Sequence, residues 1–129
     1  MVKALLVVAH GSRREASNEE VRRLCERIRN EDGVEFDLVE AAFLELAQPL
    51  IPEGIGRCIA EGASEVVVMP YFLSAGRHVS EDIPAEVEKA RRLHPQAAIH
   101  LAPYLGAADA VAKVIVNLTG GWTDGNTHE

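Results

Sequence analysis

The segment ALLVVAHGSRREASNEEV, residues 4–21, joins an apolar run to a polar loop and then to the start of a helix pattern. Residues 4–9 (ALLVVA) are apolar without interruption, which is typical of a parallel strand buried on both faces of its sheet. His10 and Gly11 follow at once, and apolar residues at helical spacing begin at Val21. A strand, a short loop and a helix form the repeating unit of parallel α/β sheets, so this segment predicts the fold class.

The same alternation continues along the chain. We predict further strands over residues 34–43, 65–73 and 97–102. Helical spacing marks the segments between and after them, through Leu50, Ile51, Ile55, Cys58 and Ile59, then Ile83, Val87 and Ala90, then Val111, Ala112, Ile115 and Leu118. Four β–α units with short connections predict a single three-layer α/β domain, in which a four-stranded parallel sheet carries helices on both faces.

Local signals set the expected boundaries. Ser17 and Glu20 have the spacing of a capping box, so we expect the first helix to begin there. A chain of 129 residues fits one domain. We expect that domain over residues 1–120, and a flexible polar tail over residues 121–129.

Composition restricts the function classes. The formal net charge of −7 argues against a general nucleic-acid binder, which needs a basic surface. The apolar run at 4–9 is too short for a membrane span, which takes about 20 residues, so we expect no membrane partner. Cys25 and Cys58 fall on apolar helix faces and form no CxxC motif, so we predict two buried, reduced thiols and a cytoplasmic location.

Residues capable of chemistry collect at one predicted edge of the sheet. Ligands of open α/β sheets bind beyond the carboxyl ends of the strands. His10, Glu45, His78 and Tyr104 follow the four predicted strands in turn. The loops that carry them also hold Ser12, Arg13, Ser74 and Arg77. Three other histidines lie away from this edge, namely His94, His100 and His128.

The side chains at this edge include groups that would bind a metal cation and groups that would bind an anionic ligand. Two imidazoles and a carboxylate are ligands for divalent first-row metals such as cobalt, nickel, iron and zinc. Arg13, Arg77 and the helix N-termini expected near residues 17–20 and 80–84 would attract carboxylates or phosphates. A site that binds a metal and also captures an acidic ligand accounts for both sets.

Other interpretations stay open at this point. His10 and His78 could serve only as hydrogen-bonding groups that tie loops together. A histidine beside arginine could instead accept a phosphoryl group, although the order His10-Gly11-Ser12-Arg13 reverses the usual arrangement of arginine before histidine. Ser12 lies in no GxSxG motif, and the chain contains neither GxGxxG nor GxxxxGK[ST], so hydrolase, dinucleotide and P-loop chemistries are disfavoured.

Four stretches carry a family resemblance. They are VVAHGSR at 7–13, FLELAQP at 43–49, VVVMPYFLSAGRHVSEDIP at 66–84 and LAPYLG at 101–106. In this order they resemble the small sirohydrochlorin cobaltochelatases, the short CbiX type of class II chelatase, from about residue 3 to residue 118. The resemblance implies a chelatase-like α/β unit, a relative of the flavodoxin-like fold, that pairs as a homodimer.

The resemblance also implies an activity. These enzymes insert Co²⁺ into sirohydrochlorin without ATP, releasing two protons, on the anaerobic route to cobalamin. Close relatives insert Fe²⁺ or Ni²⁺, and no cofactor beyond the substrate metal is implied. By motif, the metal-binding histidines are His10 and His78, and Glu45 matches a catalytic acidic position. Ser12, Arg13, Ser74, Arg77 and Tyr104 would then bind the carboxylates of the macrocycle. A carrier of metal or tetrapyrrole without turnover remains the alternative.

Overall fold

The computed structural model describes residues 1–122 and contains four strands in one parallel sheet. The strands are β1 (Val2–Ala9), β2 (Leu38–Phe43), β3 (Ala63–Pro70) and β4 (Ala98–Leu101). Their order across the sheet is β2-β1-β3-β4, and every neighbouring pair is parallel. The apolar run ALLVVA thus forms most of a central strand, as its composition predicted.

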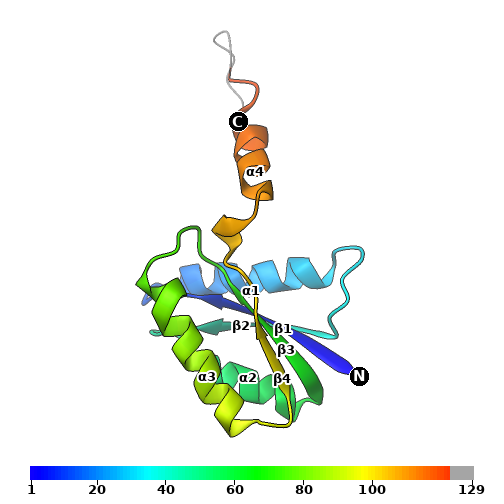
Figure 1. The fold of residues 1–129 in the computed structure, drawn as a ribbon. Coiled ribbons are helices and arrows are strands. Elements are labelled where there is room, and N and C mark those ends of the chain that lie inside the picture. Colours follow the sequence, from blue (N-terminus) through cyan, green and yellow to red (C-terminus); the bar gives the residue numbers. More distant parts are fainter. Residues whose placement is uncertain (123–129) are drawn as a thin grey trace.

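Helices alternate with the strands along the chain (Figure 1). They are α1 (Glu15–Arg29), α2 (Ile51–Ala60), α3 (Ile83–Leu93) and α4 (Ala110–Thr119). A π-helical turn, η1 (His78–Asp82), runs directly into α3, and a 3₁₀ turn, η2 (Leu105–Ala107), precedes α4. The predicted single α/β domain, with four parallel strands and helices on both faces, is confirmed.

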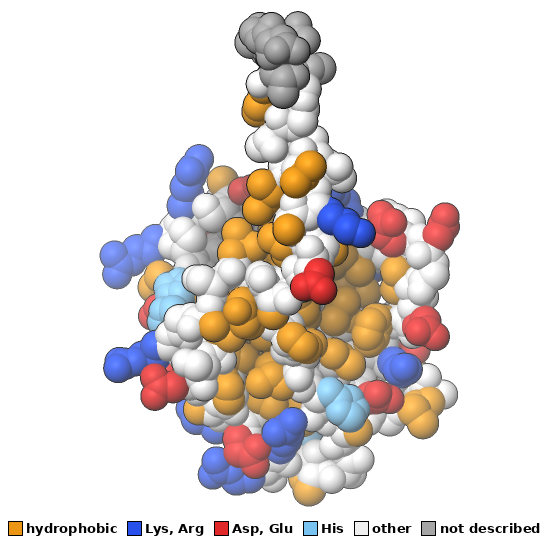
Figure 2. Space-filling model, turned by 45° about the horizontal axis from the view of Figure 1, so that its top comes forward, with side chains coloured by type: hydrophobic (Ala, Val, Ile, Leu, Met, Phe, Trp, Pro, Cys, Tyr) orange, Lys and Arg blue, Asp and Glu red, His pale blue; other side chains and the backbone are white. Residues whose placement is uncertain are grey.

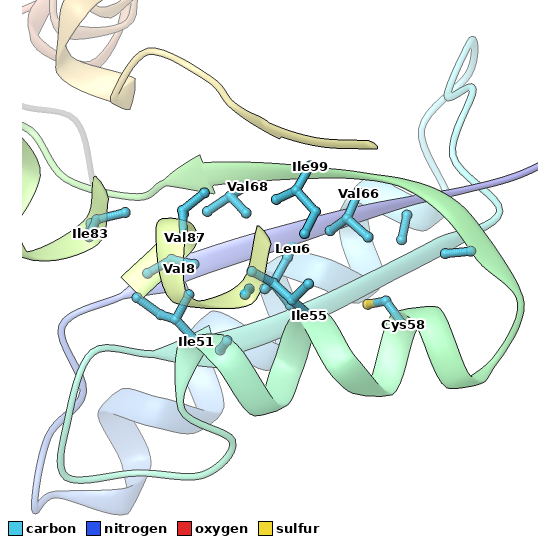
Figure 3. Close-up of a cluster of buried hydrophobic side chains, with 14 residues drawn as sticks. Leu6, Val8, Ile51, Ile55, Cys58, Val66, Val68, Ile83, Val87 and Ile99 are labelled. Atoms are coloured by element: carbon cyan, nitrogen blue, oxygen red, sulfur yellow. The ribbon is translucent and has the colours of Figure 1, made fainter. Parts of the chain in front are cut away.

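Two apolar clusters hold the three layers together. On one face, α2 and α3 bury Ile55 and Val87 against Leu6 and Val68 of the sheet (Figure 3). On the opposite face, α1 packs its buried residues over β1 and β2, and Phe43 is fully buried there. Burial of these side chains out of water is the main force that stabilises the arrangement.

Cys25 and Cys58 are free and buried, one in each cluster, as predicted. Burial raises the pKa of both thiols to about 11, because the charged thiolate is poorly solvated inside the core. Both side chains are therefore neutral thiols at physiological pH.

Several boundaries differ from the sequence-based expectations. The capping box is wrong: α1 begins at Glu15 after Arg14, so Ser17 already lies inside its first turn. The second strand begins at Leu38 rather than at residue 34, and the third ends at Pro70 rather than at 73. The residues beyond Pro70 form the loop that leads to His78, although the apolar side chains at its start resemble those of a strand.

The last helix forms where it was predicted but does not pack on the sheet. α4 stands off the domain beyond η2 (Figure 1), and none of its residues is buried. The third layer on that side of the sheet is therefore α1 alone. The predicted tail from residue 123 onward, His128 included, lies outside the described residues. Among residues 1–122, no helix is both long and apolar enough to cross a membrane.

Candidate functional site

The end of β1 places His10 beside Glu45. Backbone pairing continues beyond the strands, because the Glu45 N–H donates to the carbonyl oxygen of His10 at 3.0 Å. Between them Gly11 turns the chain with a φ of +94°, and a Cβ on it would lie 1.8 Å from the Glu45 carbonyl oxygen. Only glycine allows the two backbones to approach so closely. The loop after β2 is thereby held against the loop after β1.

The side chains of this pair also meet. Nε2 of His10 lies 3.0 Å from Oε2 of Glu45, and its Nδ1 lies 2.9 Å from the Gly11 carbonyl oxygen. Both ring nitrogens therefore face oxygen acceptors. A metal ion can bind at Nε2 only when that nitrogen has given up its proton, and the Glu45 carboxylate is placed to accept it.

His78 comes from the loop that follows β3 and begins η1. Its Nδ1 lies 2.8 Å from Oδ2 of Asp82, one turn further along the chain. A carboxylate at this distance fixes the tautomer with the proton on Nδ1, which leaves Nε2 as the basic nitrogen. Among residues 1–122, Nε2 of His78 has no hydrogen-bond partner, so it is available to a ligand.

The two histidines lie side by side. Their ring centroids are 4.7 Å apart, with the planes at 65°. About two fifths of each histidine side chain is exposed to solvent. The pair is thus accessible to a ligand from solvent. Each imidazole also pairs with its own carboxylate, His10 with Glu45 and His78 with Asp82.

A shallow cavity of about 370 Å³ adjoins this cluster. It is lined by Leu44, Glu45, His78, Asp82, Ala85 and Glu86. Three of these side chains are carboxylates, so the cavity favours a cation over an anion. In residues 1–122, no three His, Cys, Asp or Glu side chains are arranged to hold a metal ion together.

Asn18 holds the loop that follows His10 through two hydrogen bonds. Its side chain is only 2% exposed. Its Oδ1 accepts from the Ser12 N–H at 2.9 Å, and its Nδ2 donates to the Ser12 carbonyl oxygen at 2.8 Å. Ser12 Oγ in turn accepts from the Arg14 N–H at 3.0 Å. The hydroxyl of Ser12 is therefore engaged in holding the turn that precedes α1.

The remaining predicted residues make no hydrogen bond or ion pair with His10, Glu45 or His78. Arg13 and Ser74 are exposed, and Arg77 is exposed and lies 3.3 Å from Glu81. Tyr104 is half-buried at the start of η2 and makes no hydrogen bond to His10, Glu45 or His78. The first turn of α1 contains its own anion, Glu15, whose pKa is lowered by a hydrogen bond from Arg22.

Two residues of the site were missed in the sequence. Asp82 lies four positions after His78, the spacing that places two side chains on one face of a helix, and this spacing was a usable signal. Asn18 gave a weaker signal, as a polar residue three positions before Val21 on the inward face of α1. Both residues orient the histidine loops through hydrogen bonds.

Known relatives resemble the chain over most of its length. A sirohydrochlorin cobaltochelatase of Methanococcus aeolicus is 39% identical over 83 residues, which cover 64% of this chain and 57% of that protein. A sirohydrochlorin ferrochelatase of Priestia megaterium is 30% identical over 113 residues, or 88% of this chain and 42% of that protein. The chain thus spans about half the length of these curated relatives.

The fold has solved counterparts. The sirohydrochlorin chelatase SirB from Bacillus subtilis subspecies spizizenii, solved in complex with cobalt, superposes with a TM-score of 0.80 at 31% identity. The match covers 91% of this chain and 49% of that one. The CbiX family model matches residues 4–119, a range that includes most of β1, both histidine loops and α4. The chain therefore belongs to the CbiX family.

Proposed function

We propose that this protein is a metal chelatase that inserts Co²⁺ into sirohydrochlorin and releases two protons, as in the anaerobic synthesis of cobalamin. The observation that carries the proposal is the paired arrangement of His10 with Glu45 and His78 with Asp82 around an open, acidic cavity. The proposal is supported by the family and by relatives that act on sirohydrochlorin.

The two pairs are suited to different tasks. His78 presents a basic Nε2, since Asp82 occupies its Nδ1, so we assign it as a ligand of the incoming metal. His10 lies against Glu45, which makes this pair the acceptor of protons from the pyrrole N–H groups as the metal enters. Before insertion, while its Nε2 is unprotonated, His10 would also bind the metal, and the pair would take up the pyrrole protons as the metal leaves for the ring. No further cofactor takes part in this proposal.

The macrocycle would be held from outside the cavity. Its peripheral carboxylates are repelled by Glu45, Asp82 and Glu86, so they must bind further out. Arg13 and Arg77 are exposed on the two histidine loops, where they can reach such groups. We assign Ser12, Ser74 and Tyr104 to the same rim.

The carboxylates also weigh against a phosphohistidine enzyme. A phosphoryl group on Nε2 of His10 would stand beside the Glu45 carboxylate, now 3.0 Å from that nitrogen, and like charges at such a distance repel. The arrangement therefore favours a cationic reactant at His10.

Cobalt is proposed over iron and nickel because the four motifs resemble the short cobalt enzymes, although relatives include both cobaltochelatases and ferrochelatases. We further propose that the protein works as a homodimer in the cytoplasm, where the buried thiols of Cys25 and Cys58 stay reduced.

The test is an anaerobic insertion assay. Catalytic amounts of protein are mixed with excess sirohydrochlorin and Co²⁺, Fe²⁺ or Ni²⁺ in turn, and the visible spectrum is followed. We expect many turnovers, fastest with Co²⁺. A reaction that stops at one equivalent would indicate a carrier, and rates no higher than without protein would refute the proposal.

A further inference from the structure

The inward face of α1 carries one buried polar side chain. The buried residues of this helix are Asn18, Val21 and Cys25, and Asn18 is only 2% exposed. An apolar residue at this position would add to the core, whereas a buried amide destabilises the fold unless its donor and its acceptor are both hydrogen-bonded. Both are bonded here, to the backbone of Ser12. The amide is therefore placed for a role beyond packing.

The two hydrogen bonds of Asn18 hold two successive peptide groups. The Ser12 N–H, which donates to Oδ1 at 2.9 Å, belongs to the peptide group that joins Gly11 to Ser12. The Ser12 carbonyl oxygen, which accepts from Nδ2 at 2.8 Å, belongs to the next peptide group. A peptide group is planar, so a residue that holds its N–H also sets the direction of its carbonyl. Asn18 thus determines where the Gly11 carbonyl oxygen points.

The Gly11 carbonyl oxygen faces the ring of His10. It lies 2.9 Å from Nδ1, and a carbonyl oxygen can only accept a hydrogen bond. Nδ1 therefore carries a proton when it bonds to this oxygen, and Nε2 is then the nitrogen that can bind a metal ion or take up a proton. Nε2 is turned toward Glu45, whose Oε2 is 3.0 Å away. The direction of one carbonyl thus sets which nitrogen His10 presents to the site.

Gly11 makes a restraint from outside the turn necessary. Glycine has the widest range of backbone conformations, and Gly11 already has a φ of +94°. With no side chain at Gly11 to limit it, the peptide group that follows could rotate and turn its carbonyl away from His10. The amide of Asn18, fixed in the first turns of α1, opposes this rotation.

We propose that Asn18 is a positioning residue of the site. By holding the peptide group that follows Gly11, it keeps a proton on Nδ1 of His10 and leaves Nε2 to the ligand. Asn18 acts without touching that ligand, because it is enclosed in the fold. Histidine side chains, in contrast, reach the surface beside acidic side chains (Figure 2).

The two histidines of the site are then oriented by different means. Asp82 places its carboxylate 2.8 Å from Nδ1 of His78, in direct contact and partly exposed to solvent. His10 is oriented through a peptide group by a buried amide. The effect of Asn18 on metal binding rests on the proposed function, whereas its effect on the ring of His10 does not.

The experiment compares three variants of the whole chain with the wild type. Asn18→Ala removes both hydrogen bonds, and Asn18→Leu removes them while keeping a branched side chain, so that the role can be measured in whichever variant folds. Val21→Ala is the control, because Val21 lies one turn further along the same face, is 7% exposed and packs only in the apolar cluster. Circular dichroism checks the fold, and urea unfolding measures the stability of each variant.

Two measurements report the role itself. In ¹⁵N–¹H spectra of the histidine rings, we expect wild type and Val21→Ala to show a proton on Nδ1 of His10 that is protected from exchange with water. Both Asn18 variants should lose this protection. In titrations with Zn²⁺ alone, the Asn18 variants should bind about 10–100-fold more weakly, as is typical when a group that orients a metal-binding histidine is removed. Val21→Ala should keep the wild-type affinity.

Three results would overturn the positioning role. They are a wild type without the protected Nδ1 proton, a folded Asn18 variant that keeps both this proton and the Zn²⁺ affinity, and equal losses in Val21→Ala. Co²⁺ insertion is measured separately. A wild type that inserts no metal would refute the chelatase, and the ring spectra would still test whether Asn18 orients His10.

Discussion

The imidazole rings of His10 and His78 meet edge to face, with their centroids 4.7 Å apart. They come from loops after β1 and β3, the two strands at the centre of the sheet. At this separation both imidazoles can contact the same bound ligand. Glu45 and Asp82 support the pair from either side.

Asp82→Asn should weaken the site without unfolding the protein. The carboxylate that fixes the His78 tautomer is lost while the shape is kept, and removing such a partner typically costs about 10–100-fold in metal affinity or activity. Metal affinity and kcat are measured, and ¹⁵N chemical shifts of His78 report the tautomer. Glu88→Gln, an exposed carboxylate on α3, is the control. An unchanged tautomer and unchanged affinity would show that Asp82 does not orient His78.

Gly11→Ala should damage both stability and activity. Its φ of +94° costs about 1–2 kcal/mol for a residue with a side chain. The added methyl would also collide with the Glu45 carbonyl and displace the Glu45 loop.

Gly33→Ala is the matched control. Gly33 has a φ of +82°, but nothing lies within 4 Å of a Cβ placed there, so this variant reports the backbone cost alone. Urea unfolding and the insertion rate are compared for both. Equal free energies of unfolding and equal rates would contradict the proposed close packing at Gly11.

Arg13→Ala should raise KM for sirohydrochlorin and leave kcat nearly unchanged. The exposed guanidinium is assigned to the carboxylate rim rather than to the reacting atoms. A rise of about tenfold corresponds to a loss of about 1.4 kcal/mol in binding. Salt should raise the wild-type KM more than that of the variant, because the lost contact is ionic. The control is Arg92→Ala, on the exposed side of α3, which should change neither KM nor kcat. An equal rise of KM in both variants would argue against the assignment of Arg13 to substrate binding.

Stability should fall as the pH rises above about 9. Unfolded cysteine ionises with a pKa of 9.0, whereas burial holds the pKa of Cys25 and Cys58 at about 11 in the fold. Between these pH values the thiols of the unfolded chain release protons that the thiols of the folded chain keep. The stability that the two thiols contribute is fully present below pH 9 and is lost as the pH rises toward 11. Urea unfolding at pH 8, 9 and 10 measures how steeply the midpoint falls with pH. The fall should be shallower when both cysteines are replaced by alanine. An identical fall would exclude these thiols as its source.

The fold and the position of the site were largely predictable. Apolar runs such as ALLVVA and helical spacing at Val21 and Cys25 reflect burial, which dominates the energetics of an α/β core. The rule for strand carboxyl ends placed His10, Glu45 and His78 at one edge of the sheet, where the structure brings the three side chains together.

The remaining features depend on contacts that a pattern does not encode. The capping box predicted a helix start at Ser17, but α1 begins at Glu15. Asn18, which lies inside the helix, hydrogen-bonds the backbone N–H and carbonyl of Ser12 in the preceding turn. Tyr104 follows its strand as expected, yet it makes no hydrogen bond to His10, Glu45 or His78. The spacing of Val111 and Leu118 predicted a helix with an apolar side, but the spacing did not indicate that every residue of α4 would stay unburied.

The most direct test of the central claim is the rate of Co²⁺ insertion by His10→Ala and His78→Ala, with His94→Gln as the control at the far end of α3. We predict that each alanine variant, folded by circular dichroism, loses about 10²-fold or more of the rate, as expected for a group that transfers protons or binds the reacting ion. His94→Gln should keep the wild-type rate. Full rates in both alanine variants would contradict the account.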